Sequence, residues 1–364
     1  DSEPVNLVSA STSKNIYGQG IAKLNGGWVV AGDLNTSAQF GNFQVAANSP
    51  YDLPQYNIRP DLFVSHLDSN GQWVWASSPD ASAGLTIFSA LTSGPNDEVY
   101  VIGDFFGDVA FGAHTIYSDF SDQDMFIAKL DSQGNWQWAV GFDSLSESGY
   151  SAAAGVSIAP NGDVIVTGTH KGLTDMGGIQ VNASDEEVFL VRFNSTGKTL
   201  WARNAGGLGS ETATDVIVDS TDHIWQLSYT RATFTVDGMT HQATGAVDMV
   251  LVGYNSNGNA TSLSGINGGG TSEIIAGFSM AVDASDRLYI CGIFTGNANG
   301  PGFSLTSAGG QDIFVLKVSS TGSYVWAESA GSTGDESVED ITVLASGEIF
   351  ITGSFDPRMD IGED

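Results

Sequence analysis

The amino-acid sequence predicts an all-β protein whose tandem units form the blades of a β-propeller. A segment of one design recurs five times along the 364 residues at a nearly constant period. A second hairpin pattern precedes each recurrence, so a unit contains four strands. The two ends of the chain carry complementary parts of a sixth unit, which is how propellers close their ring and remove sheet edges.

The recurring segment starts with an acidic residue and an apolar run, passes through a polar turn with glycine and ends in a strand that usually carries tryptophan. The turn glycines are 63, 63, 61 and 64 residues apart, at Gly71, Gly134, Gly197, Gly258 and Gly322. Two alternating apolar runs around such a turn predict a β-hairpin. The acidic residues at the strand start are expected to bond to a turn; they are Asp61, Asp124, Glu187, Asp248 and Asp312.

The preceding hairpin is clearest where residues 156–158 and 164–168 flank Asn161 and Gly162, and it returns at residues 341–353. The variable stretch between the two hairpins often contains Phe-Gly or Gly-Phe, which predicts a short edge ribbon. No amphipathic helical stretch of ten or more residues occurs, so parallel βαβ architecture is excluded. A linear solenoid or a string of small domains is the alternative, but units of about sixty residues are long for a solenoid coil and short for an independent core.

The chain ends complete the blade count. Residues 5–10 resemble the fourth strand of a unit, and residues 336–355 supply the first two strands of one. We expect one domain over residues 1–364 with six four-stranded blades, the N-terminal strand closing the last. The expected blade units are residues 11–77, 82–141, 147–206, 211–266, 273–330, and 336–364 together with 1–10.

The third strand of the sixth blade is missing from this pattern. Three explanations stay open: the chain is a fragment of a longer one, residues 359–361 form the strand, or a neighbouring molecule donates one by β-augmentation.

The charge balance limits the partners. Lys and Arg total 12 against 42 Asp and Glu, and a net charge of -30 repels nucleic acid and anionic membranes. No run of apolar residues is long enough for a membrane helix. The composition, rich in Gly, Ser, Thr and Asn, favours an extracellular or cell-surface location. The lone Cys291 lies in an apolar run and is expected to be a buried core residue, while the five histidines occupy non-equivalent repeat positions without metal-ligand spacing.

Four glutamates fall at matching places in the loop that enters each unit: Glu147, Glu211, Glu273 and Glu336. Ring closure would gather them on one face around the axis, where like charges need solvent, hydrogen bonds or a cation. The simpler interpretation is that each Glu caps its own loop by accepting backbone N–H groups. The other is a site for a cation, for which Ca²⁺ is the candidate. No catalytic or cofactor-binding residue is assigned.

The repeat carries a resemblance to a known group of proteins. Strands ending in Val-Thr-Gly or Ile-Thr-Gly (residues 166–168 and 351–353) are followed in the units by Asp-x-Phe-Val-x-Lys-Leu-Asp and Gly-x-x-x-Trp-Ala patterns. These units resemble the bacterial β-propeller repeats of large secreted and surface proteins (SBBP-type repeats). The resemblance covers nearly the whole chain and implies a propeller with a structural or surface role and no established chemistry.

A second resemblance concerns tryptophan. Residues 194–201 are similar to the tryptophan-docking motif of quinoprotein propellers, in which a Trp four residues after the turn Gly stacks against the neighbouring blade. A large flat ring between twisted sheets buries much apolar area. The fourth unit has Ser262 at the Trp position and Val250 in place of Phe, so we expect its junction to be the loosest. The expected locking residues are Trp75, Trp138, Trp201 and Trp326.

These observations favour a non-enzymatic extracellular module, used for structure or interaction in a surface or secreted assembly. Its expected partner is another protein or a second copy, bound through the incomplete last blade, with a glycan as a further candidate. Two other functions stay open. A carbohydrate-binding lectin would use exposed rings such as Tyr51, Tyr56 and Phe120, while a hydrolase or lyase would carry an acidic site that breaks the repeat symmetry.

Overall fold

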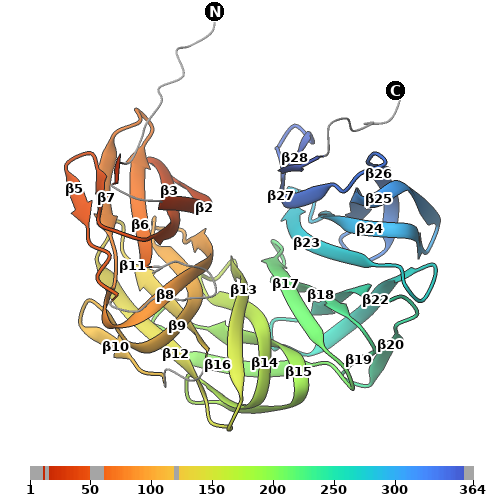
Figure 1. Cartoon of the computed structure of the whole chain (residues 1–364), viewed down its shortest axis with the longest axis horizontal. Helices are drawn as coiled ribbons and strands as arrows, with labels where there is room; N and C mark the ends of the chain where they lie inside the picture. Colours follow the sequence, from red (N-terminus) through yellow and green to blue (C-terminus); the bar gives the residue numbers. More distant parts are fainter. Residues whose placement is uncertain (1–10, 13–15, 50–60, 119–122, 356–364) are drawn as a thin grey trace, which may run out of the picture. The chain divides into compact units, whose positions relative to one another are not determined.

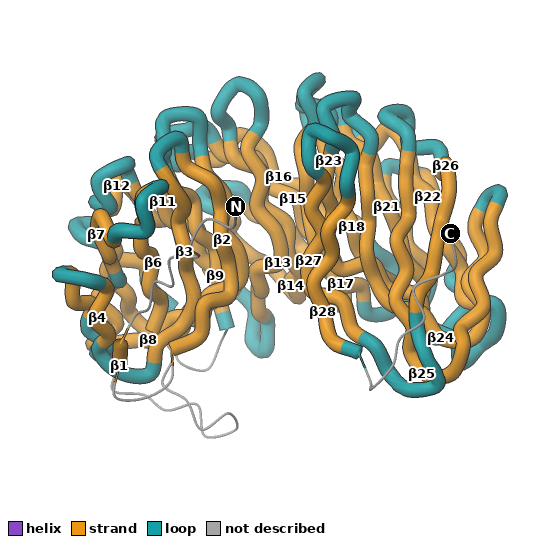
Figure 2. The backbone as a smooth tube through the Cα atoms, turned by 90° about the horizontal axis from the view of Figure 1, so that it is seen from above, coloured by secondary structure: helices purple, strands orange, loops and turns teal. Residues whose placement is uncertain are grey.

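The computed structural model describes residues 11–12, 16–49, 61–118 and 123–355. These residues form strands, turns and loops (Figure 2). The described part of the chain contains no helix, and therefore none long and apolar enough to cross a membrane. The all-β prediction is therefore confirmed. The chain divides into two compact units, one of residues 1–158, 172–180 and 193–199, the other of residues 159–171, 181–192 and 200–364.

The first compact unit contains two complete four-stranded antiparallel sheets (Figure 1). The first blade has the strand order β2-β3-β6-β7 and the second β8-β9-β11-β12. Outer ribbons are formed by β4 and β5, which β1 joins, and by β10 with the end of β9. The strands are β1 (Ser11–Thr12), β2 (Ile16–Leu24), β3 (Gly27–Leu34), β4 (Ala38–Phe40), β5 (Phe43–Val45), β6 (Asp61–Asp68), β7 (Trp73–Ser77), β8 (Asp80–Ser93), β9 (Val99–Phe111), β10 (His114–Ile116), β11 (Asp124–Leu130) and β12 (Trp136–Ser144).

The third blade is built from four strands through which the division between the compact units passes. They are β13 (Tyr150–Ile158), β14 (Val164–Met176), β15 (Gln180–Phe193) and β16 (Thr199–Ala205).

The second compact unit contains two further complete blades, with strand orders β17-β18-β21-β22 and β23-β24-β25-β26. The pair β27–β28 follows as a sheet of two strands. The strands are β17 (Glu211–Val218), β18 (Ile224–Thr230), β19 (Thr233–Val236), β20 (Met239–Gln242), β21 (Asp248–Tyr254), β22 (Ala260–Gly268), β23 (Ile275–Val282), β24 (Leu288–Gly300), β25 (Phe303–Val318), β26 (Tyr324–Ala330), β27 (Ser337–Val343) and β28 (Ile349–Ser354). The β19–β20 ribbon and the paired ends of β24 and β25 confirm the edge ribbons predicted from the variable stretches.

These four-stranded units confirm the β-propeller fold class predicted from the repeat. The number of blades and the single domain over residues 1–364 stay predictions. The closing strand expected at residues 5–10 and the substitute strand at residues 359–361 lie outside the described residues.

Glycine in the second strand of a blade creates space for the aromatic ring of the third. Gly103 pairs with Phe126, and Gly292 pairs with Phe314. A Cβ atom on Gly103 would lie 3.0 Å from the Phe126 ring, and one on Gly292 would lie 2.7 Å from the Phe314 ring. The recurring Gly and Phe are therefore two halves of one packing unit.

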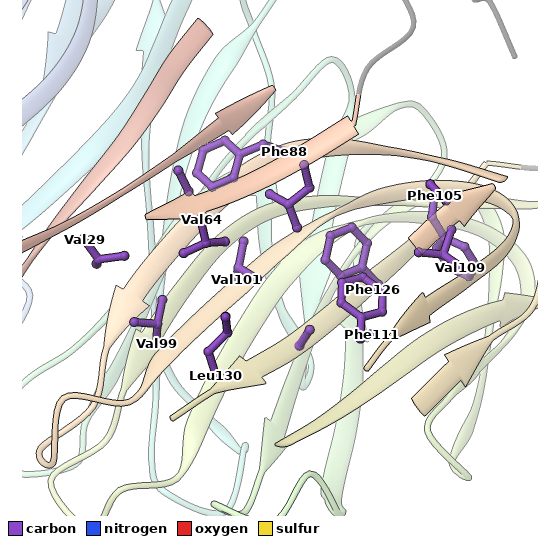
Figure 3. Packing of buried hydrophobic residues seen from close by; sticks show 14 of the residues in the cluster. Val29, Val64, Phe88, Val99, Val101, Phe105, Val109, Phe111, Phe126 and Leu130 are labelled. Atoms are coloured by element: carbon purple, nitrogen blue, oxygen red, sulfur yellow. The ribbon is translucent and has the colours of Figure 1, made fainter. Parts of the chain in front are cut away.

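The core of the first compact unit lies between its sheets (Figure 3). Val29 and Val64 of the first blade pack in one cluster with Phe88, Val101 and Phe126 of the second, and each is at most 5% exposed. Strands buried on both faces need near-continuous apolar runs, which is what the third strands of the repeat contain.

Indole rings lie against the turns of the following blade. Trp138 Nε1 donates to Ser195 O at 3.2 Å, and a Cβ on Gly197 would lie 2.7 Å from the Trp138 ring. At the fourth blade, where Ser262 replaces Trp, Gly322 of the next turn lies instead beside Trp225 of β18. The same arrangement as for Trp138 holds for Trp75 with Ser132 and Gly134, and for Trp201 with Ser256 and Gly258.

Candidate functional site

A β-bulge interrupts the first strand of several blades at the same place. In the second compact unit the register shifts after Ala213 in β17, after Gly277 in β23 and after Val338 in β27. A bulge bends its strand and redirects the neighbouring side chain. The first paired residues after these bulges are Asp215, Ser279 and Asp340, on three strands that pack beside one another in the order β17, β23 and β27.

Asp215 is held by the backbone of two strands. Its Oδ2 accepts the Met280 N–H at 2.7 Å, and its Oδ1 accepts the Val216 N–H at 2.7 Å. The residue retains partial solvent exposure. Burial of the carboxyl group, with a smaller contribution from the negative charge of Asp340, raises its pKa to about 7 against these two hydrogen bonds.

Asp340 occupies the same position in β27 and is exposed to solvent. Its Oδ1 accepts the Ser279 hydroxyl at 2.7 Å and the Ile341 N–H at 2.8 Å. The Ser279 hydroxyl thus orients the Asp340 carboxylate, and the N–H of the next residue, Met280, orients the Asp215 carboxylate. The result is a pair of carboxyl groups in different environments, one whose pKa burial raises to about 7 and one that is exposed to solvent, and such pairs perform general acid–base chemistry. We name Asp215, Ser279 and Asp340 the carboxylate pair site.

Two further carboxyl groups whose pKa is raised to about 7 lie in the first compact unit. Asp33 Oδ1 accepts the Phe88 N–H at 2.9 Å, and Asp104 Oδ1 accepts the Ala153 N–H at 2.9 Å. Burial raises the pKa of each to about 7. Asp33 is 6% exposed and Asp104 9% exposed, so these groups join one blade to the next and are closed to a large substrate.

In the second compact unit, Thr169 occupies the position that corresponds to Asp104 in its blade. Its hydroxyl accepts the Ala213 N–H at 3.2 Å. The hydrogen bond across the blade junction therefore recurs with a neutral acceptor. This substitution indicates that the role of the position is structural.

Of the four predicted glutamates, Glu211 and Glu336 show the geometry of the loop-capping role. Glu211 is fully buried and accepts the Gly207 N–H at 3.1 Å and the Thr230 hydroxyl at 3.1 Å. Glu336 is 1% exposed and accepts the N–H and hydroxyl of Ser332, at 3.1 and 2.7 Å.

The other two predicted glutamates differ. Glu147 is exposed, and Glu273 is half-buried with no hydrogen bond to its Oε2. Within the described residues no three His, Cys, Asp or Glu side chains gather as metal ligands.

The acidic residues at the start of the third strands behave as the sequence predicts. Asp61 accepts the N–H groups of Asn48 and Ser49, the latter at 3.0 Å, and Asp248 accepts those of Thr244 and Gly245. Burial raises the pKa of Asp61 to about 6. These residues secure the loops that lead into the strands.

The acids at the start of the third strands and the loop glutamates affect each other's pKa values. Burial raises the pKa of Glu211 to about 7, and the charges of Glu187 and Asp185 contribute. Burial likewise raises the pKa of Asp312, with a contribution from Glu336.

Cysteine and histidine add no chemistry to the carboxylate pair site. Cys291 is fully buried, as the sequence predicts, and burial raises the pKa of its thiol to about 12. Burial lowers the pKa of His170 to about 4, so this imidazole is neutral. Tyr51, Tyr56 and Phe120, expected as sugar-stacking rings, lie outside the described residues.

Sequence reasoning missed the carboxylate pair site because it sought residues that recur in every blade. Asp215 and Asp340 share a position, but Ser279 occupies it in the blade between them. The signal was a break in the symmetry, and it lies partly in the divergent fourth blade. A search for acids that follow a bulge, rather than acids that repeat, would have found both.

Comparisons with known proteins describe the fold. No known family profile matches the chain. The chain is 20% identical to an uncharacterized WD repeat-containing protein of Acanthamoeba polyphaga mimivirus, over 86% of this chain and 27% of that protein, so it spans about a quarter of the relative's length.

Similar solved structures carry the names of enzymes. A glucose dehydrogenase matches with 10% identity and a TM-score of 0.43 over 95% of this chain and 96% of its own. A sialidase, Hz136, from a Hadza microbial source, matches with 12% identity and a TM-score of 0.43 over 89% and 60%. A gluconolactonase from Xanthomonas campestris matches with 12% identity and a TM-score of 0.32 over 64% and 65%.

These names correct one expectation. The sequence favoured a non-enzymatic structural module, whereas these three similar structures are named as enzymes, in better agreement with the alternative of a hydrolase or lyase with an acidic site. The mistaken preference came from weighing repeat symmetry, which reports on blade packing and not on chemistry. All three TM-scores are below 0.5, so the argument for function rests on the side chains of the carboxylate pair site.

Proposed function

We propose that the chain is an acid–base enzyme of the hydrolase or lyase class, acting on glycosidic bonds at the carboxylate pair site. The observation that supports this is the pairing of Asp215, whose pKa is raised to about 7, with the solvent-exposed Asp340 on a nearby strand. Two carboxyl groups in environments that differ in this way are the usual set for glycosidic cleavage.

The roles follow from the environments of the two groups. Asp215 holds a proton near neutral pH and donates it to the departing glycosidic oxygen. Asp340, which is exposed to solvent, removes a proton from the attacking water, or from a ring carbon in the lyase case. Ser279 positions Asp340 through its 2.7 Å hydrogen bond. A net charge of -30 favours a neutral glycan over a polyanionic one.

Proton donation by Asp215 gives a first test. Release of reducing ends from a panel of neutral polysaccharides is measured for the whole chain, and formation of unsaturated uronide from uronate polymers is measured in parallel. Asp215→Asn is expected to lower the rate by about 10²- to 10⁴-fold, the usual contribution of general acid–base catalysis. Asp104→Asn, which alters a buried carboxyl in the other compact unit, is the matched control and should keep the activity.

The pH profile separates catalysis from folding. Activity should fall as pH rises through about 7, because Asp215 then loses its proton. Asp340→Asn removes the negative charge that helps to raise the pKa of Asp215. Any residual activity of this variant should therefore begin to fall at a lower pH than the activity of the native chain. A chain that cleaves neither class of polymer, or an Asp215→Asn variant as active as the native chain, contradicts the proposal.

An extracellular location belongs to the same proposal. A glycan-cleaving enzyme meets its substrate outside the cell, and the acidic composition keeps the chain soluble in salt. Finding the protein in the culture medium or on intact cells, by antibody against the native chain, would support this location.

A further inference from the structure

The second strand of every complete blade is covered by a third strand, but β28 among the described residues pairs with β27 alone. The β27–β28 pair has the register of a complete blade: Val343 opposite Ile349 and Val338 opposite Gly353 correspond to Val282 opposite Leu288 and Gly277 opposite Gly292. The strand β28, drawn in blue near the C-terminus in Figure 1, is therefore a second strand with one edge that no other described strand covers.

The apolar residues of this strand are exposed where their counterparts are buried. Phe350 is 53% exposed against 2% for Tyr289, and Ile351 is 38% exposed against 0% for Ile290. Phe355, just beyond β28, is 61% exposed, whereas Phe294 at the matching position is fully buried. An apolar groove of about 270 Å³ lies beside the strand, lined by residues that include Phe314, Val315, Ala330 and Ile351.

Complete blades show which residues the free edge would accept. Gly353 corresponds to Gly292, which leaves room for the ring of Phe314 in the third strand. The atoms nearest to a Cβ built on Gly353 belong to Ser337 and Val338 of β27, and among the described residues no third strand pairs with β28. A phenylalanine opposite Gly353 would fill that space.

Two further positions define the incoming strand. In the complete blade Asp312 lies two residues before Phe314 and pairs with Phe294, which corresponds to Phe355. The incoming strand should therefore carry an acidic residue two positions before its Phe, opposite Phe355. Three residues after the Phe, a basic residue lies over an aromatic ring: Lys317 Nζ is 4.8 Å from the Tyr289 ring centre. In β28 the matching ring is Phe350, exposed and ready for a cation on its face.

We infer that β28 binds an extended segment, supplied from outside these 364 residues, with the pattern acid-x-Phe-x-x-Lys or Arg. Residues 1–10 and 356–364 contain no such pattern. Strand addition supplies main-chain hydrogen bonds, and the Gly353 space, Phe350 and Phe355 supply sequence specificity. A basic residue in the segment also complements the acidic chain.

The test uses the whole chain and a labelled synthetic peptide with the sequence of residues 311–330, a third and fourth strand of this protein. Binding is followed by fluorescence anisotropy, and amide hydrogen exchange is followed at residues 349–355. We expect saturable binding with slowed exchange at these amides. A peptide carrying Phe314→Ser and Lys317→Glu should bind at least about tenfold more weakly, since it loses the buried ring and the cation–π contact.

A surface variant keeps the test independent of folding. Phe350→Ser alters an exposed side chain and should weaken the native peptide about fivefold, the value of one cation–π contact. Leu200→Ser, an exposed apolar residue on β16 of a complete blade, is the control and should bind normally. Equal binding of the two peptides overturns the inference, and so does slow exchange at residues 349–355 before any peptide is added, because the edge would then already be covered.

Discussion

At the residue scale, the blade-joining carboxyl of Asp104 makes stability depend on pH. Its pKa is raised above the ordinary value because burial penalises the charged form, so its contribution is complete in acid and declines as pH rises from about 4 to about 7. In Asp104→Asn the amide oxygen still accepts the Ala153 N–H, and the Gln123 side chain can rotate to suit the amide.

We expect Asp104→Asn to be more stable than the native chain at pH 8, by about 1 to 3 kcal/mol, and no more stable at pH 4. Urea denaturation at the two pH values measures the difference. Thr169→Val is the comparison, because it removes the neutral acceptor of the same bond and should cost stability equally at both. A pH-independent effect of Asp104→Asn would mean that the carboxyl is charged in the folded chain.

At the element scale, the proposed tryptophan locks make a graded prediction. Trp138 is 9% exposed, bonds to Ser195 and lies on Gly197. Trp138→Ala should lower the free energy of unfolding by about 3 to 5 kcal/mol, the usual cost of removing a buried large aromatic side chain. Trp326 has an equivalent place in β26, but the described residues contain no third and fourth strand after β28, and so no turn between them that could lie against this ring.

Trp326→Ala is therefore expected to cost clearly less, and chemical denaturation of both variants measures the difference. The looser junction predicted for the fourth blade is tested in the same way. Its gap is occupied by Trp225, on which His223 stacks with ring centres 4.5 Å apart. If that junction is loose, Trp225→Ala should destabilise the chain less than Trp138→Ala does. If the stacked rings of His223 and Trp225 make up for the missing tryptophan at position 262, the two variants should be destabilised equally.

At the scale of the whole molecule, the surplus of 30 negative charges leads to a prediction about Ca²⁺. A cation that binds only the folded chain raises its melting temperature in proportion to the logarithm of its concentration. We expect millimolar Ca²⁺ to raise the melting temperature and a chelator to reverse the change. Mg²⁺ at equal concentration controls for general screening, and an unchanged melting temperature with the chelator would remove the cation role proposed for Glu147, Glu211, Glu273 and Glu336.

The repeat by itself determined the fold class, the four strands of each unit, the hairpin turns and the acidic residues that secure the third strands. These features are local: alternation, a turn glycine and an acid at a strand start act within one blade, so a single unit of sequence contains the whole signal. Five copies then remove the ambiguity of any one. The exposed edge of β28 was visible in the same way, as a missing copy.

Only the tertiary structure decided which carboxyl groups hold protons. Burial raises the pKa values of Asp33, Asp104 and Asp215, while backbone N–H groups that arrive from the next blade lower them in part, and neither effect is written in the surrounding residues. The pairing of Asp215 with Asp340, 125 positions away in the sequence, likewise required three strands to lie side by side. Sequence periodicity reports what every blade shares, whereas chemistry arises where neighbouring blades differ.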